Sequence, residues 1–390
     1  MYVNVMLSDF SFSSSNVLID GKLQKGSLTI EQGKIQLDRE SSPYRHYNMG
    51  NFYILPGIID LHGDGFERHL FPRPSAPVEH TIALKNLSNE LIYNGITTAY
   101  LAQCYSWEGG YRSPEFTTEL LTSLKILKND FMPDLRLQIR FETHLIDEKK
   151  YLIDLIDQFN IDYLVFNNHL PEAIKKWEND KPRIEAWAGQ TGRTGEQHIN
   201  IVKGYLKNNV RVKGFLEELS GELKRRNITL GSHDDDSPSD REYYNSLGAY
   251  ICEFPTTFQA AEAAKKNNNG VIMGAPNIMR GGSQAGNIDA INLVKSDLVD
   301  CLVSDYYYPA LLESVWKMAD MKVRSFENSY EMISTNPARL LDLADRGKLV
   351  DNARADLLIL NPDNRKIVAV FCRGIPFFVS DELVGSLSAA

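Results

Sequence analysis

Cysteine is scarce in this 390-residue sequence, and long apolar runs are missing from it. The four cysteines, Cys104, Cys252, Cys301 and Cys372, form no C-x-x-C pair. This spacing excludes a small disulfide scaffold and favours buried thiols in a reduced protein. No window approaches the ~20 apolar residues that span a bilayer, and no basic segment precedes an apolar stretch near residue 1. We therefore expect a soluble, cytoplasmic protein that has no membrane partner.

Basic residues are outnumbered by acidic ones, at 42 Lys and Arg against 51 Asp and Glu, which gives a formal net charge of −9. This excess argues against a nucleic-acid partner but allows a local cationic pocket for a phosphorylated small molecule. Because 43% of the residues are hydrophobic, the composition is that of an ordinary globular protein. At roughly 150 residues per domain the length predicts two or three domains, and it leaves a homo-oligomer open.

The two ends of the sequence both consist of short β-type runs separated by turn residues. Residues 1–54 contain Asp20-Gly21 and Gln32-Gly33, which is the turn chemistry of hairpins. The C-terminal part has two apolar runs on either side of the turn-forming segment 361–364. We expect the two ends, 1–54 plus 347–390, to pair into one small β-sandwich domain.

Between these ends, at residues 55–346, short apolar runs alternate with helix-like stretches. This rhythm predicts parallel strands covered by helices. Eight strand candidates can be counted, at 58–61, 96–101, 135–141, 163–166, 228–231, 250–254, 271–274 and 301–304. Eight strands with helices between them predict an α/β fold of the (β/α)8 TIM-like barrel type.

Two kinds of local signal refine this barrel. Helix starts are predicted at Ser113-Pro114 and at a capping box formed by Thr256 and Gln259. Residues 171–227 form a long insertion, in which the glycine-rich segment 189–195 is a lid candidate.

Polar residues follow the predicted strands where each strand ends. His62 and Asp64 follow the first run, and their i, i+2 spacing sends both side chains to one face. Four others follow the third, fourth, fifth and eighth runs: Glu142, His169, His233 and Asp305. Active sites of barrels collect at this end, and imidazole and carboxylate suit zinc, manganese or iron. We interpret the six as a metal site large enough for two ions; the alternative is a polar barrel rim without metal.

A glycine-rich segment after the seventh predicted strand, residues 275–287, is an anion-site candidate. Arginine and glycine backbone N–H groups suit phosphate, and late-strand loops often bind it. Arginines downstream of the first strand add positive charge. The candidate substrate-binding residues are Arg280, Gly281, Gly282, Ser283, Asn277, Arg73 and Arg68. The alternatives are a flexible turn and surface ion pairs.

Together these residues resemble the amidohydrolase superfamily, whose members join a metal-bearing barrel to a small β-sandwich. The segments 55–62 and 95–98 carry that likeness. Within the superfamily, the chain is most similar to the PhnM-type diphosphatases of α-D-ribose 1-methylphosphonate 5-triphosphate. The matching motifs lie at 232–235, 253–257, 273–277, 280–283 and 304–307. The chain departs from those diphosphatases at Gly63-Asp64-Gly65, where they carry Thr and Asn around the Asp.

The resemblance implies a cofactor of two divalent metal ions, with zinc as the first choice and manganese and iron as alternatives. One ion would be held by His62, Asp64 and Asp305, and the other by His169 and His233. Glu142 would bridge them, where many relatives carry a carboxylated lysine. Superfamily members usually place the bridging ligand on the fourth strand, so the resemblance also predicts either an uncounted strand between 101 and 135 or a later strand that is counted as two.

The implied activity is hydrolysis of a phosphoanhydride in phosphonate catabolism, with release of pyrophosphate. Asp305 is the predicted catalytic proton acceptor. The enzymatic alternative is an amidohydrolase that acts on a C–N bond, as a deaminase or N-acyl hydrolase. The non-enzymatic alternative is a barrel that has lost catalysis and binds a phosphorylated ligand or a partner protein.

Overall fold

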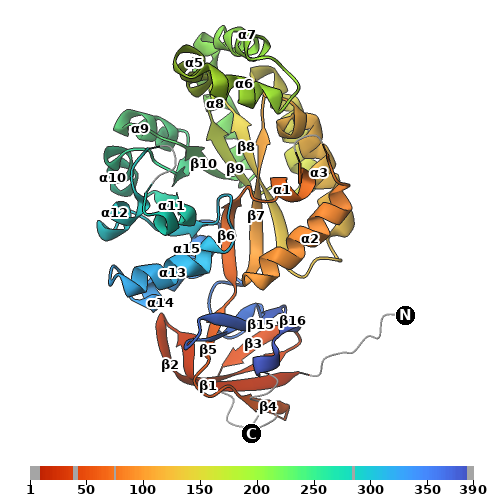
Figure 1. Cartoon of the computed structure of the whole chain (residues 1–390), viewed down its shortest axis with the longest axis vertical. Coiled ribbons are helices and arrows are strands. Elements are labelled where there is room, and N and C mark those ends of the chain that lie inside the picture. Colours follow the sequence, from red (N-terminus) through yellow and green to blue (C-terminus); the bar gives the residue numbers. More distant parts are fainter. Residues whose placement is uncertain (1–8, 38–42, 74–75, 283–285, 384–390) are drawn as a thin grey trace.

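The structure is a computed structural model that describes residues 9–37, 43–73, 76–282 and 286–383. Two sheets organise it, and Figure 1 shows the smaller one below the larger, with the long insertion at the far end. All four cysteines are free and buried, as predicted. Within the described ranges no helix has the length and apolar character that a membrane crossing requires.

The larger sheet is a nearly closed barrel of eight parallel strands. They are β6 (Ile58–Gly63), β7 (Ile96–Tyr105), β8 (Asp134–Glu142), β9 (Tyr163–Asn167), β10 (Thr229–His233), β11 (Ala249–Glu253), β12 (Gly270–Gly274) and β13 (Cys301–Val303). Each strand pairs with the next, and a parallel bridge between Gly63 and Asp305 links the first strand to the last. The eight predicted strands are confirmed.

The extra strand expected between 101 and 135 is wrong. This segment contains the end of β7, the short turn η1 (Gly110–Arg112) and helix α3 (Pro114–Leu127). The Ser113 side chain caps α3 by accepting from the Phe116 N–H at 3.2 Å, as predicted. Buried leucines at helical spacing then face the barrel, so this stretch has no strand periodicity.

Helices lie between the strands and cover the barrel. The remaining ones are α1 (Glu67–Leu70), α2 (His80–Tyr93), η2 (Ile146–Glu148), α4 (Lys149–Phe159), α5 (Leu170–Asn179), α6 (Lys181–Gly189), α7 (Gly195–Leu206), α8 (Asn209–Arg225), α9 (Pro238–Ser246), α10 (Phe258–Lys266), α11 (Ala275–Arg280), α12 (Ala290–Lys295), α13 (Ala310–Asp320), α14 (Phe326–Glu331) and α15 (Thr335–Leu340). Helix α10 begins one residue later than predicted, because Thr257 rather than Thr256 caps it, accepting from the Ala260 N–H at 3.2 Å.

The insertion forms the four helices α5 to α8, at the end of the barrel away from the smaller sheet (Figure 1). The lid candidate is the short link between α6 and α7. There Arg193 donates to the Glu108 carbonyl at 2.6 Å, and Gln190 accepts from the Tyr111 hydroxyl at 3.0 Å. The link therefore packs against the loop that follows β7.

The smaller sheet contains strands from both ends of the sequence, as predicted. They are β1 (Phe10–Ile19), β2 (Lys22–Glu31), β3 (Lys34–Leu37), β4 (Arg45–Asn48), β5 (Tyr53–Pro56), β14 (Leu357–Asn361), β15 (Lys366–Cys372) and β16 (Ile375–Val379). Most neighbours are antiparallel, but β1 pairs in parallel with β4 and β5. Positive φ angles at Asp20, Gly21, Gln32 and Gly33 make the two predicted hairpin turns.

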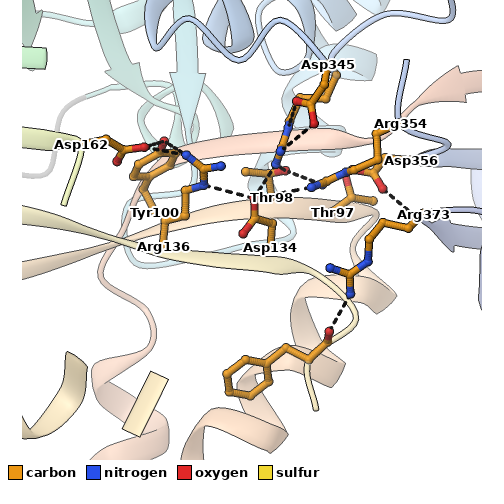
Figure 2. A network of polar contacts seen from close by, with 12 residues as sticks. Thr97, Thr98, Tyr100, Asp134, Arg136, Asp162, Asp345, Arg354, Asp356 and Arg373 are labelled. Carbon is orange, nitrogen blue, oxygen red and sulfur yellow. Dashed lines mark hydrogen bonds and ion pairs between the residues drawn. The ribbon is translucent and has the colours of Figure 1, made fainter. Parts of the chain in front are cut away.

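A network of charged residues joins the smaller sheet to the amino end of the barrel strands (Figure 2). Asp134, at the start of β8, accepts from Arg346 at 2.6 Å and contacts Arg136 and Arg354 at 3.1 and 3.5 Å. Arg354 also pairs with Asp356, which accepts from the Arg373 N–H at 2.8 Å. Each carboxylate in this network therefore has guanidinium or N–H partners.

Candidate metal centre

The six predicted metal ligands all lie at the carboxyl end of the barrel strands. Two are at the end of β6, and the others end or follow β8, β9, β10 and β13: His62, Asp64, Glu142, His169, His233 and Asp305. Parallel strands bring these ends to one rim. The structure therefore gathers residues that are as far apart as 62 and 305 in the sequence.

Gly63 lets the first and last strands approach closely at this rim. A Cβ atom there would lie 2.8 Å from Asp60 Oδ2 and 2.9 Å from Ser304 Oγ, so only glycine fits. The backbone N–H groups of Asp64 and Gly65 donate to the Asp305 carbonyl at 2.9 and 3.2 Å. The contact that closes the barrel thus places Asp64 beside Asp305.

The first candidate metal-ligand group is formed by His62, His233 and Glu253. Glu253 Oε2 lies 2.9 Å from His62 Nδ1 and 3.2 Å from His233 Nδ1, and the two rings are stacked with centroids 5.3 Å apart. The other oxygen, Oε1, accepts from Gln138 and Tyr163 at 2.6 Å each. When both histidines donate from Nδ1, each neutral ring keeps its lone pair on Nε2.

The second group is formed by Glu108, Glu142 and His169. Glu142 Oε2 accepts from Trp107 Nε1 at 3.1 Å and from the His169 backbone at 3.2 Å. Glu108 accepts from Trp187 Nε1 at 2.5 Å, so helix α6 of the insertion holds one of the carboxylates. Both glutamates are almost fully buried, at 1% exposure each.

Two buried atoms in this second group have no hydrogen-bond partner. They are Glu142 Oε1 and His169 Nδ1, which converge on each other. Beyond this ion-pair contact neither atom has a partner among the described residues, and a carboxylate oxygen beside an imidazole nitrogen is a donor set for a divalent cation. The residues present therefore fit a metal ion.

Sequence reasoning missed two members of these groups, Glu253 and Glu108. Glu253 stands at the end of the sixth strand, in the same place as the predicted ligands, and within the 253–257 motif. That position was the available signal. Glu108 lies in the loop after β7 without such a signal. His233 contacts Glu253 beside His62, whereas His169 contacts Glu142, so the two histidines assigned to one ion lie in different groups.

A cavity of about 210 Å³ opens beside the first group. Its lining includes His62, Asp64, His233, Asp305, Arg140, Asn277, Arg280 and Gly282. Three of the predicted substrate residues thus reach the same space as four of the predicted ligands. A larger groove, of about 1560 Å³, extends from His169 and His233 along α5 and α9.

The other predicted substrate residues lie elsewhere. Arg68 is held by Glu90 and donates to the Tyr306 carbonyl at 2.9 Å, and Arg73 is an exposed residue in the loop after α1. Gly281 ends α11 in a left-handed conformation and is not among the lining residues. Ser283 falls outside the described residues.

Crowded carboxyl groups and backbone strain mark the rim. Burial, and then the neighbouring Asp64, raises the pKa of Asp305 from its usual 3.8 to about 7. Asp234 and Phe254, each directly after a strand, and Asp305, two residues after β13, have φ values of 59°, 52° and 54°. Such left-handed residues cluster at functional sites. Phe254 thereby packs edge-on against the His62 and His233 rings, at 5.0 Å from each.

Comparisons with known proteins agree with this architecture. The chain is 29% identical over 361 residues, 90% of its own length and 95% of the relative's, to the α-D-ribose 1-methylphosphonate 5-triphosphate diphosphatase of Escherichia coli (strain K12). No protein-family model matches the sequence. The similarity to the diphosphatase confirms the predicted resemblance.

Solved structures share the fold. A crystal structure of an amidohydrolase has a TM-score of 0.64 at 14% identity, covering 96% of this chain and 100% of the other. The β-aspartyl dipeptidase of Fervidobacterium islandicum AW-1, in complex with a β-Asp-Leu dipeptide, has a TM-score of 0.61 at 13% identity, with 95% and 97% coverage. These likenesses support the barrel and the added sheet.

Proposed function

We propose that this chain, a hydrolase of the amidohydrolase superfamily, cleaves the triphosphate of α-D-ribose 1-methylphosphonate 5-triphosphate, or of a related phosphonate, and releases pyrophosphate. The substrate is carried over from the diphosphatase of Escherichia coli, which the chain matches over 90% of its length. One observation carries the proposal at the site: histidines, carboxylates and arginines line a single cavity.

We further propose the arrangement around that cavity. The chain divides into a β-sandwich domain, 1–54 plus 347–390, and a (β/α)8 TIM-like barrel domain, 55–346, and it works in the cytoplasm. His62, Asp64, His233 and Asp305 would hold one divalent ion, and Glu142 and His169, which lie in the second group, would hold the other. Zinc is the first choice, because imidazole and carboxylate are its usual ligands outside thiolate sites.

Divalent cations, when bound, polarise phosphoryl oxygens and acidify water. The oxygen of the attacking water forms a bond to the α-phosphorus, and Asp305 accepts a proton from that water. The bond between that phosphorus and the bridging oxygen of the α–β anhydride breaks, and its electron pair leaves with pyrophosphate. Arg280 and the backbone at Gly282 then face the departing negative charge.

A phosphorus NMR assay of the zinc-loaded protein with ribose 1-methylphosphonate 5-triphosphate tests the proposal. We expect pyrophosphate and ribose 1-methylphosphonate 5-phosphate to appear together. Release of orthophosphate, or no turnover of the triphosphate, contradicts it. Turnover of acylated amino acids or nucleobases instead would establish action on a C–N bond. A purified protein without stoichiometric metal, and without gain from added zinc, manganese or iron, would favour a non-catalytic barrel.

A further inference from the structure

We propose that Arg140 forms an anion subsite inside the metal centre, which binds the oxygens of a phosphoryl group and so selects phosphoanhydrides over amides. This inference rests on the proposed function for its substrate class. Arg140 lies on β8, two residues before Glu142, so both side chains face the barrel interior. It is only 8% exposed, and it lines the cavity beside His62 and Asp305.

Arg140 is poorly paired for a buried cation. Its Nη2 lies 3.1 Å from His233 Nε2, and its Nη1 lies 3.9 Å from Asp64 Oδ2, which is beyond hydrogen-bond distance. Its Nε is buried and has no partner among the described residues. A guanidinium has five N–H donors, so most of its bonding capacity is unused.

The other buried arginines of the chain are paired more fully. Arg241, which is fully buried, also has an Nε without a partner, but its other nitrogens donate to Ser232 at 2.7 Å, to Asp235 at 3.0 Å and to the Ala249 carbonyl. Arg346 donates to Asp134 at 2.6 Å and to Thr98 at 3.0 Å. Both satisfy the rule that a buried charge needs close partners. Arg140 does not, and the space beside it is a cavity rather than packed side chains.

The contact with His233 also depends on the state of the centre. His233 Nδ1 faces Glu253, so Nε2 is the atom that accepts from Arg140 and the atom through which the ring would ligate a cation. A cation at Nε2 takes that lone pair and leaves Nη2 of Arg140 without its acceptor. A phosphoryl group supplies charged oxygens that match the guanidinium fork. A neutral amide carbonyl offers no charge to offset a second buried cation.

Arg140 and Arg280 share the cavity at different depths. Arg280 is exposed at the end of α11, whereas Arg140 is buried among the ligand residues. A chain of linked phosphates suits two cations placed in this way, because one phosphate reaches the interior while another stays near the surface. This placement assigns Arg140 to the reacting phosphoryl group and Arg280 to the departing phosphates.

The test compares the zinc-loaded wild type with Arg140→Gln and Arg140→Lys, using inorganic phosphate as the probe in calorimetry. Arg226→Gln is the matched control, since Arg226 pairs with Asp157 at 2.9 Å far from the cavity. We expect at least tenfold weaker phosphate binding in Arg140→Gln, partial recovery in Arg140→Lys, unchanged zinc content, and wild-type affinity in the control. With the triphosphate, Arg140→Gln lowers kcat more than it raises KM.

Two results for phosphate overturn the inference: the wild type does not bind it, or Arg140→Gln binds it with wild-type affinity. Loss of zinc from both Arg140 variants also overturns it, because Arg140 would then act by supporting His233. The outcome is separable from that of the proposed function. Phosphate binding that requires Arg140, without cleavage of the ribose triphosphate, refutes only the substrate. Cleavage that is unaffected by Arg140→Gln refutes only the subsite.

Discussion

Asp134 and Asp305 lie at opposite ends of the barrel strands, and their environments shift their pKa values in opposite directions. Burial raises the pKa of Asp305, and a carboxylate neighbour adds to the effect, which brings it to about 7. Burial alone would also raise the pKa of Asp134, but the guanidinium groups of Arg136 and Arg346 lower it to about 2. The amino end thus pairs its charges internally (Figure 2), whereas the carboxyl end leaves several buried polar atoms without a hydrogen-bond partner.

This difference separates stability from function along one barrel. At the amino end, the carboxylates of the network form ion pairs with arginines, and these pairs help to hold the two sheets together. At the carboxyl end, Glu142 Oε1, His169 Nδ1 and Arg140 Nε are buried without hydrogen-bond partners. Buried polar atoms without partners destabilise the folded protein, but they can bind a ligand that supplies the missing interactions. Substitutions at the two ends should therefore fail in different ways.

The largest effect is expected for Asp305→Asn. Asparagine tolerates the left-handed φ of 54° at this position, so the fold should persist. Loss of the carboxylate removes the proton acceptor that we propose, and turnover should fall by about 10²- to 10⁴-fold. Pyrophosphate release measures the loss, and thermal unfolding checks the fold. Near-normal turnover would remove Asp305 from the mechanism.

Glu253→Gln should weaken metal binding at the carboxyl end. The substitution keeps the shape but removes the charge that faces His62 and His233. Loss of such a partner typically costs about 10- to 100-fold in metal affinity. Zinc titration against a competing chelator measures it, with Glu217→Gln on the exposed face of α8 as the control. Equal affinity in the two variants would show that Glu253 does not support the metal centre.

Asp134→Asn should affect stability and leave the chemistry intact. It removes one of the two carboxylates that pair with Arg346, which is 6% exposed at its side chain, and leaves Asp345 as the other. Breaking a buried pair in this way costs about 3 kcal/mol of unfolding free energy. Urea unfolding measures the loss, and Asp320→Asn, in an exposed pair with Arg365, should cost much less unfolding free energy than Asp134→Asn. Reduced turnover per folded molecule in Asp134→Asn would contradict the view that the amino end of the barrel contributes to stability and not to catalysis.

The smallest expected effect is the pH dependence of that same pair. The folded pKa of Asp134 is about 2, below its usual 3.8, so its contribution is complete above about pH 4 and is lost as the pH falls towards 2. The stability difference between wild type and Asp134→Asn should therefore shrink between pH 5 and pH 3. Urea unfolding at these two pH values measures the change. A difference that stays constant would show that the pairing does not lower the pKa.

The barrel could be predicted from sequence because each strand is a short apolar run bounded by turn or cap residues. All eight runs became strands, and Ser113 capped the helix that its position predicted. The strand added by analogy with the superfamily was wrong, whereas the direct count was right. The parallel pairing of β1 with β4 and β5 could not be predicted, because it depends on contacts between distant segments.

The sequence predicted those site residues that are histidines or carboxylates at the ends of predicted strands. Glu253 ends an apolar strand as the predicted ligands do, and its contacts with His62 and His233 then show its role. In the sequence, Arg140 does not differ from other residues of alternating strands. Only the structure shows that it lines a cavity. The tryptophan that holds Glu108 comes from the insertion, nearly eighty positions away, and only the folded chain joins the two.

The seam between the first and last barrel strands has a consequence for how the protein is made. Ser304 donates to Asp60 from its hydroxyl at 2.5 Å and from its backbone at 3.0 Å, across 244 positions of the chain. A ribosome must therefore release nearly the whole barrel before His62, Asp64 and Asp305 can meet. A nascent chain shorter than that cannot bring together the three residues that we propose as ligands, so capture of a cation by them would report closure of the barrel.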